Sequence, residues 1–381
     1  MVSFKFLMCI YSTITVYVIC IYSSISKNYT LFSFDLLHVI KKIRVQFLAI
    51  LSLPLSLSMG IDPPFQETYR ALWKGFCVRA KEEECKEFEL PLIDMSRLRL
   101  GDSAERKKYI KAASEWGFFQ VVNHGISEEV LQSLRYEQMK VFHQPFNNKS
   151  QRNFLNLPSN SYRWGNSYAS CLSQFPWSEA LHLSPADISR IDGYTNLRSS
   201  IEAFAGTAAT LAQTLAEILA ENLGVKSSFF TENCTSRTSC IRMNRYPSCP
   251  FSSEVYGLVP HTDSDILTIL YQDQTGGLQL LRDGRWLTVK PNPQSLTINI
   301  GDLLQVFSND VYRSIQHRVV APQQVERFSL AYFYCPSSDA VIQSYRTPTK
   351  YRKFTFREYK QQILKDLQAT GNKVGLSRFL F

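Results

Sequence analysis

The hydrophobic pattern of the chain changes from a helical to an alternating period near residue 240. Before that point, apolar residues recur every three or four positions, which is typical of helices with one face on a core. The longest such segment keeps a single apolar stripe over about seven turns and stops at Gly224, so we expect a long core-facing helix. The predicted helices cover 103–115, with Ser103 as N-cap, 127–142 and 196–223.

After residue 240, apolar and polar residues alternate in short runs that are separated by Gly-Gly, Asp-Gly, Pro-Asn-Pro and Gly-Asp. Many short strands between such turns are typical of a β-sandwich or jelly roll. Two β-rich runs also occur earlier, at 90–98 and 116–126, and a helix is expected over 350–370, outside the sheets. The predicted strands of the second half cover 241–246, 258–263, 266–272, 278–281, 286–290, 295–300, 303–307, 317–320 and 327–334.

The first 58 residues differ from the rest of the chain, because they carry five Lys or Arg against one acidic residue. Within them, the uncharged stretch 6–26 is long enough to cross a bilayer as a helix. One interpretation is a membrane anchor or signal peptide, and the other, which we favour, is that 1–58 are not part of the working protein. The predicted parts are then 1–58, a hydrophobic extension; 59–235, helical and mixed; 236–340, the jelly roll; and 341–381, a helical segment.

Charge and cysteine content limit the class of protein further. The net charge is +9, but beyond the N-terminal stretch both signs are mixed and no basic stripe with interleaved aromatics occurs, so a nucleic-acid partner is not expected. The nine cysteines form no C-x-x-C pair, and an odd number cannot all be bridged within one chain. We therefore expect reduced thiols and a cytoplasmic location, with the nucleus as a second compartment that is consistent with the same observation.

The sequence His261-Thr262-Asp263 lies in a predicted strand, and His317 lies at the start of a later one. Residues two apart on a strand point to the same face, so His261 and Asp263 can reach one ion. Two imidazoles and a carboxylate form the facial triad that suits Fe(II) and leaves other coordination positions for substrates. A histidine-x-aspartate pair alone is weak, because a chain of this length often contains one by chance.

Two further clusters strengthen the metal hypothesis. Arg327 and Ser329 share one face of a predicted strand, and a guanidinium beside a hydroxyl is a suitable receptor for a carboxylate. Asn244 and Tyr246 alternate in the same way on another strand and can project a polar pair into the same cavity. Metal site, anion receptor and polar pair thus all fall in the β-rich half of the chain.

The order of Asn-Arg-Tyr-Pro (244–247), His-Thr-Asp, the later histidine and Arg-Phe-Ser resembles the plant 2-oxoglutarate and iron(II)-dependent dioxygenases. The likeness extends from Leu90 to Phe381. It implies an α+β fold, with a double-stranded β-helix (jelly-roll) core and flanking helices. It also implies Fe(II) as cofactor, 2-oxoglutarate and O2 as co-substrates, and ascorbate as reductant. The implied roles are iron ligands for His261, Asp263 and His317, and 2-oxoglutarate contacts for Asn244, Tyr246, Arg327 and Ser329.

A narrower likeness involves 161–165, 177–180 and 255–280, which resemble gibberellin 2-oxidases, in particular the branch that acts on C20 gibberellins. The resemblance implies hydroxylation of carbon 2 on the β face, which inactivates the hormone. Tyr162, Arg163 and Trp164 are candidate substrate contacts, and Arg163 is the candidate cation for the substrate's carboxylate. The other interpretation of these three residues is a loop that packs on the barrel mouth.

Two other functions are consistent with the same residues. One is a related dioxygenase that acts on another plant metabolite, such as a flavonoid or a different gibberellin carbon. The other is a hormone-binding protein on the same scaffold that does not turn its ligand over. His124 lies in a predicted turn, and His143 and His182 lack ligand-like neighbours in the sequence, so all three are expected to be structural.

Overall fold

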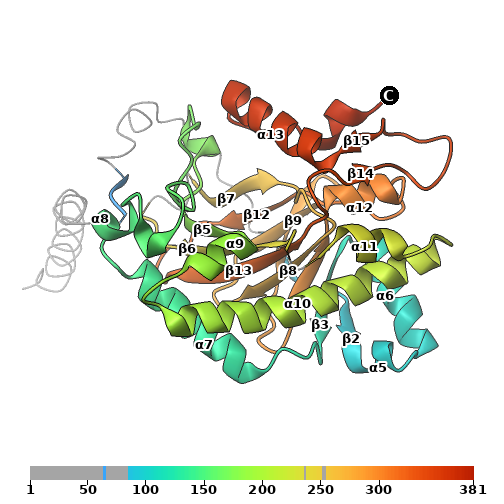
Figure 1. Ribbon diagram of the computed structural model, residues 1–381, viewed down its shortest axis with the longest axis horizontal. Coiled ribbons are helices and arrows are strands. Elements are labelled where there is room, and N and C mark those ends of the chain that lie inside the picture. The colour runs from blue at the N-terminus through green and yellow to red at the C-terminus, as the bar shows by residue number, and fades with distance from the viewer. Residues whose placement is uncertain (1–62, 66–84, 236, 251–254) are drawn as a thin grey trace, which may run out of the picture. The chain divides into compact units, whose positions relative to one another are not determined.

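Two β-sheets form the core of the computed structural model, which describes residues 63–65, 85–235, 237–250 and 255–381. All of these residues belong to one compact unit, Asp62–Phe381. The sheets make a sandwich with helices around it (Figure 1), which confirms the predicted α+β jelly roll. The predicted extension 1–58, with its apolar stretch 6–26, lies outside the described residues.

The larger sheet has eight strands and draws on both halves of the chain. Neighbouring strands within this sheet are antiparallel, except that β2 and β3 run parallel. The N-terminal half supplies both ends of the sheet, because its short apolar strands are buried against the later ones. In spatial order the strands are β2 (Leu92–Asp94), β3 (Phe118–Val122), β11 (Leu296–Ile300), β8 (Leu267–Gln272), β13 (Arg327–Tyr334), β6 (Cys240–Tyr246), β5 (Glu179–Leu183) and β4 (Tyr162–Trp164).

The smaller sheet has five strands, and its last pair brings two distant histidines together. His317 on β12 lies directly opposite His261 on β7 in the antiparallel register. The spatial order is β1 (Glu87–Phe88), β10 (Arg285–Val289), β9 (Leu278–Arg282), β12 (His317–Val320) and β7 (Tyr256–His261). A separate two-stranded sheet pairs β14 (Val341–Ile342) with β15 (Phe354–Thr355).

The long predicted helix is confirmed as α10 (Thr195–Asn222), and it contacts β8 and β13 of the larger sheet. Figure 1 shows α10 along the outer face of that sheet beside α7 (Glu128–Phe142), whose N-cap is Ser127. By length and composition α10 could cross a membrane. Its apolar stripe is instead buried in the main hydrophobic core, as expected for the central helix of a sandwich.

Three local predictions were wrong. The run 90–98, predicted as a strand, is a strand only at β2 and continues as the helix α5 (Met95–Arg99), which Asp94 caps. The helix α6 (Ser103–Glu115) is capped by Asp102, whose carboxylate accepts hydrogen bonds from the first-turn amides, and not by Ser103. Residues 303–307, predicted as a strand, belong to the helix α12 (Asp302–Phe307). The apolar run in α12 fits either element, because nearly all of its side chains are buried and no period distinguishes the two.

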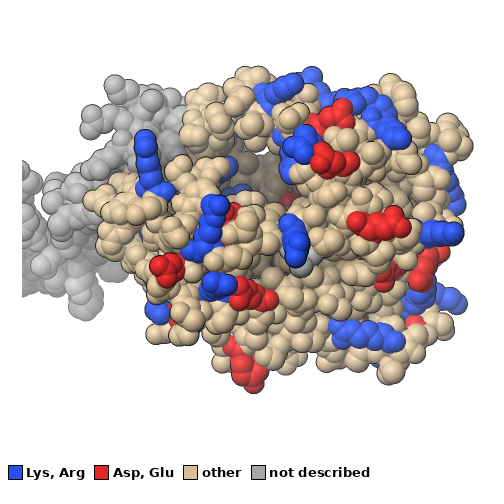
Figure 2. All heavy atoms as spheres, in the orientation of Figure 1, with Lys and Arg blue, Asp and Glu red and all other residues tan. Residues whose placement is uncertain are grey.

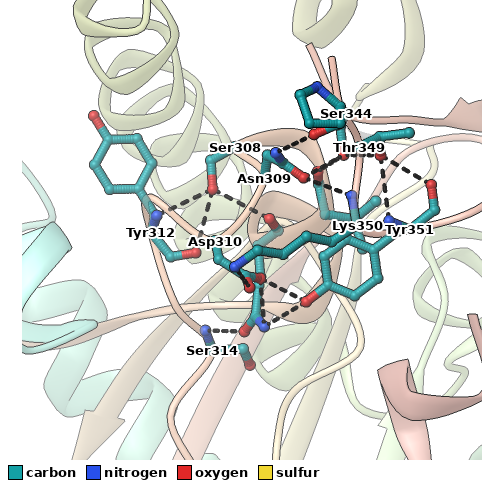
Figure 3. Close-up of polar contacts among 12 residues, drawn as sticks. Ser308, Asn309, Asp310, Tyr312, Ser314, Ser344, Thr349, Lys350 and Tyr351 are labelled. Atoms are coloured by element: carbon teal, nitrogen blue, oxygen red, sulfur yellow. Dashed lines mark hydrogen bonds and ion pairs between the residues drawn. The ribbon is translucent and has the colours of Figure 1, made fainter. Parts of the chain in front are cut away.

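The predicted C-terminal helix begins later than expected, as α13 (Phe356–Thr370), where Thr355 and Glu358 form a capping box. Before it, the segment 344–351 is tied to the turn after α12 by polar contacts (Figure 3). Asn309 accepts from the Lys350 backbone, and Asp310 accepts from the side chains of Lys350 and Tyr351. Among the described residues, the remaining helices are α8 (Phe146–Lys149), α9 (Pro185–Arg190) and α11 (Ser228–Asn233), with 3₁₀ turns at Phe154–Asn156, Leu172–Gln174 and Gly375–Phe379.

Candidate active site

His261, Asp263 and His317 converge at one end of the sandwich, and their ligating atoms all lie within 4.8 Å of one another. His261 is the last residue of β7 and His317 is the first of β12. The strand predicted over 258–263 ends at His261, so Asp263 lies just beyond it. The triad is therefore assembled by a strand pair and a turn, and not by one strand face alone.

Both histidines are oriented by backbone carbonyls. Nδ1 of His261 donates to the Val259 carbonyl at 2.8 Å, and Nδ1 of His317 donates to the Ile315 carbonyl at 3.1 Å. The Nε2 atoms then point to Oδ1 of Asp263, at 3.5 and 3.7 Å respectively. Burial, followed by the neighbouring His261, lowers the pKa of His317 to about 4. His317 therefore presents the neutral imidazole that a metal requires.

The carboxylate of Asp263 is held from behind by two buried side chains. Thr268 on β8 and Asn299 on β11 both donate to Oδ2 of Asp263, at 2.5 and 2.9 Å. Burial alone would raise the pKa of Asp263, but His317, His261 and the Thr268 hydrogen bond offset it, and the pKa falls below its ordinary value. Oδ2 is thus occupied by the protein, while Oδ1 faces the two imidazoles.

An ion pair supports the turn between the first two triad residues. Nζ of Lys373, from the C-terminal segment, donates to the Thr262 carbonyl, to Ser264 Oγ and to Asp302 Oδ2, at 2.6–2.7 Å. Asp302 also accepts from the hydroxyls of Thr262 and Tyr359. Asp302 is buried and the side chain of Lys373 is only 12% exposed, so the pair fixes this turn against the start of α12.

Arg327 brings a buried positive charge close to the triad. Its side chain is 1% exposed, and Nη2 donates to Gln272 Oε1 at 2.7 Å. Nε and Nη1 are buried without a hydrogen-bond partner in the part of the chain that the structure describes. Tyr246 lies opposite Arg327 in the strand register, and its ring is 4.7 Å from the guanidinium. A buried guanidinium with unused donors fits a ligand carboxylate.

The other predicted polar residues lie beside Arg327. Ser329 and Asn244 are directly opposite on β13 and β6, and the Asn244 amide donates to Ser329 Oγ at 3.4 Å. One cavity of about 510 Å³ is lined by the triad, Arg327 and these residues. Its apolar wall comes from both sheets and includes Phe118, Leu258, Leu270, Leu278 and Val319. The donor set of two imidazoles and one carboxylate fits Fe(II), and the adjacent cation fits a dicarboxylate co-substrate.

The three predicted substrate contacts point to two different places. Tyr162 and Trp164 line a separate cavity of about 190 Å³, and the Tyr162 hydroxyl donates to Glu179 at 2.5 Å. Arg163 points to the other side of β4 and lines a cavity of about 390 Å³ that shares Arg242 with the metal cavity. Substrate contact by these residues stays a prediction, and Arg163 has the more direct route to the metal cavity.

Two histidines have local partners that fit the expected structural role. Nδ1 of His124 accepts from the Ile126 amide at 3.2 Å, and His143 is 2.7 Å from the Glu326 carboxylate. His182 is different, because it lines the metal cavity from β5. The sequence therefore did not predict that His182 lines this cavity.

Sequence reasoning missed several residues that support or line the site. Thr268 and Asn299 are buried polar side chains within mostly apolar strands, and that pattern is the signal that could have pointed to them. Lys373 carried no signal, because its partners lie 71 to 111 residues away in the chain. Arg242 stands two residues before Asn244 on β6 and thus shares its strand face, which a stricter use of the alternation would have noted.

Family models match two parts of the chain. Residues 237–336 match the model described as 2OG-Fe(II) oxygenase superfamily. Residues 90–198 match the model described as non-haem dioxygenase in morphine synthesis N-terminal.

Curated relatives and solved structures point in the same direction. The chain is 51% identical to gibberellin 2-beta-dioxygenase 8 of Arabidopsis thaliana, over 84% of this chain and 99% of the relative. It is 42% identical to gibberellin 2-beta-dioxygenase 6 of Oryza sativa subsp. japonica, over 86% and 98% of the two chains. The crystal structure of JOX2 in complex with 2OG, Fe and JA is 31% identical, with a TM-score of 0.67 over 78% of this chain and 90% of that one.

Proposed function

Because the chain belongs to the 2OG-Fe(II) oxygenase superfamily, we propose that it hydroxylates a gibberellin at carbon 2 on the β face and so inactivates the hormone. The observation that carries the proposal is identity of 42–51% to four gibberellin 2-beta-dioxygenases over 84–86% of this chain. Identity to the jasmonate-induced oxygenases is 32–35%. Within the gibberellins we propose the C20 class as substrate, on the resemblance described above.

In this proposal His261, Asp263 and His317 hold Fe(II), and Arg327 with Ser329 binds the distal carboxylate of 2-oxoglutarate. Tyr246 and Asn244 border the same co-substrate. Bound iron supplies the activation of O2 that couples oxidative decarboxylation of 2-oxoglutarate to hydroxylation of the substrate. The unused donors of Arg327 support its role, because a dicarboxylate would satisfy them.

The remaining task of the protein is to place one C–H bond beside the metal and to keep water out. A gibberellin is a rigid, mostly apolar acid. The apolar wall between the two sheets can hold such a skeleton, while polar contacts orient it.

The test is incubation of the protein with Fe(II), ascorbate, 2-oxoglutarate and labelled C20 or C19 gibberellins, followed by product identification by mass spectrometry. We expect a 2β-hydroxylated C20 product and an equal amount of succinate. A product from a flavonoid, a jasmonate or another gibberellin carbon would assign the chain to a related dioxygenase instead.

The same assay separates an enzyme from a non-catalytic hormone-binding protein. Asp263→Ala removes one of three metal ligands, so we expect succinate release to fall to background in that variant. A wild-type protein that binds gibberellin but releases no succinate, with or without substrate, would contradict the proposal.

A further inference from the structure

Basic side chains from three separate elements gather at the outer part of the metal cavity. Arg242 on β6 and Lys360 on α13 line both the 510 Å³ cavity and the adjoining 390 Å³ cavity, and Arg163 on β4 lines the latter. Figure 2 shows a hollow on this face of the molecule, with lysine and arginine side chains along its edge. The only acidic residues that line either cavity, Asp263 and Asp265, are buried at the metal end.

Arg242 is the least exposed of these cations. Its Nε donates to Asn244 Oδ1 at 2.8 Å, but it forms no ion pair with any residue that the structure describes. Burial, rather than a neighbouring acid, dominates its electrostatics and lowers the pKa of the guanidinium. Arg245, three residues along the same strand, shows the contrast, because it is paired at 2.8 Å with both Glu179 and Glu326.

The two neighbouring cations also lack acidic partners among the described residues. Nζ of Lys360 donates to Ser338 Oγ at 3.1 Å and lies 4.4 Å from the Phe356 ring. Nε of Arg163 donates to the Asn160 carbonyl at 3.2 Å. The positive charge of Arg163 repels that of Arg242. Like charges that converge on a concave surface without counter-charges attract an anionic ligand.

We propose that Arg242, with Lys360 and Arg163 at the rim, forms the subsite that binds a carboxylate of the organic substrate. This inference rests on the proposed function and deepens it, because it assigns the residues that recognise the acid group of a gibberellin. The subsite is distinct from Arg327, which serves 2-oxoglutarate. Nε of Arg242 is held by Asn244, so the guanidinium is already oriented when the substrate arrives.

The experiment changes the charge of the side chain and of the ligand in turn. Wild type, Arg242→Gln and Arg242→Lys are assayed with a C20 gibberellin and with its fully methylated ester, which keeps the skeleton but has no charge. A charge-assisted hydrogen bond corresponds to about a 10- to 100-fold change in affinity, so we expect wild type to prefer the acid by about that factor in KM. Arg242→Gln should reduce this preference to about threefold or less, with Arg242→Lys between the two.

A matched control is Arg198→Gln, which removes an exposed guanidinium on α10 that donates to the Glu202 carboxylate and the Ser189 carbonyl, away from both cavities. It should keep the wild-type preference for the acid. If Arg242→Gln raises the KM for the acid and for the ester equally, Arg242 acts only through Asn244 and the proposed subsite is contradicted. No preference for the acid in wild type would overturn it as well.

Anaerobic calorimetric titration of the Fe(II) and 2-oxoglutarate complex with acid and ester separates this inference from the proposed function. Binding that depends on Arg242 and on the acid, without a 2β-hydroxylated product, would contradict the proposed function alone. A 2β-hydroxylated product with binding that ignores the charge would contradict the subsite alone. Absence of both binding and product would overturn the two together.

Discussion

The metal end and the outer wall of the same cavity are built in opposite ways. At the metal end, the site residues are held by other parts of the chain: Asp263 by Thr268 and Asn299, and the histidines by backbone carbonyls. At the outer wall of the cavity, the basic side chains Arg163, Arg242 and Lys360 gather without an acidic partner among the described residues. The metal end thus has fixed geometry before any ligand arrives, whereas the outer wall depends on a ligand for its counter-charge.

Arg327→Met tests the metal end where its effect should be largest. Removing a buried charge that pairs with a carboxylate costs about 3 kcal/mol of binding, so the Kd for 2-oxoglutarate should rise at least about a hundredfold. The measurement is anaerobic titration of the Fe(II) protein with 2-oxoglutarate. Since the guanidinium is incompletely paired without co-substrate, the apoprotein should unfold at the same or higher urea concentration than wild type. An unchanged Kd would remove Arg327 from the co-substrate site.

Lys373→Met should break the ion pair behind the turn from His261 to Asp263. Asp302 would then be a buried carboxylate without its cation, and the free energy of unfolding should fall by about 2 to 3 kcal/mol. Urea denaturation measures this loss. The double variant Lys373→Met with Asp302→Asn removes the uncompensated charge and should recover part of it. Equal stability of the single variant and wild type would show that the pair does not support the turn.

Thr268→Val tests the support of Asp263 at the metal end, and we expect a smaller effect. Loss of a hydrogen bond to a metal-binding carboxylate reduces metal affinity about 10- to 100-fold, which anaerobic Fe(II) titration can measure. Thr297→Val is the matched control, because Thr297 is equally buried on neighbouring β11 and makes no side-chain hydrogen bond to a described residue. The control should keep the wild-type affinity, and a similar loss in both variants would mean that Asp263 is not supported through Thr268.

Tyr162→Phe applies the same approach to the cavity beside the outer wall and should have the smallest effect. Its hydroxyl donates to buried Glu179, so we expect a loss of about 1 kcal/mol in the free energy of unfolding, with substrate KM unchanged. Thermal unfolding and steady-state kinetics together decide the point. A rise in KM without loss of stability would favour the other interpretation, in which Tyr162 contacts the substrate.

The sequence was informative where function requires a fixed order and spacing of residues. Strand alternation and the clusters at 244–246, 261–263 and 327–329 were enough to predict that these residues meet in one β-sandwich. The prediction failed at Asp302–Phe307, where an apolar run without a period became a helix that starts from backbone contacts with the metal-binding turn. A contact between distant segments is decided by the folded chain, so no local pattern could have pointed to it.

The residues that support the metal site and those of the outer wall could not be predicted from the sequence, for the same reason. Lys373 is one lysine among many in the sequence, and only the position of the C-terminal segment places it against Thr262. Lys360 and Arg242 lie more than a hundred residues apart and become neighbours only when α13 covers the edge of the sandwich. Substrate recognition is therefore the part of the site for which structure adds most to sequence.

The proposed role of Arg327, whose Nε and Nη1 have no partner among the described residues, has a consequence for which keto acids the protein would use. Pyruvate carries the same oxo-acid group as 2-oxoglutarate but no second carboxylate, so it would enter the cavity and leave the cation uncompensated. Under this proposal, discrimination between these common metabolites would depend on Arg327 and Ser329, which bind the carboxylate that pyruvate lacks. Hormone breakdown by this chain is coupled in that way to central carbon and nitrogen metabolism, of which 2-oxoglutarate is a shared intermediate.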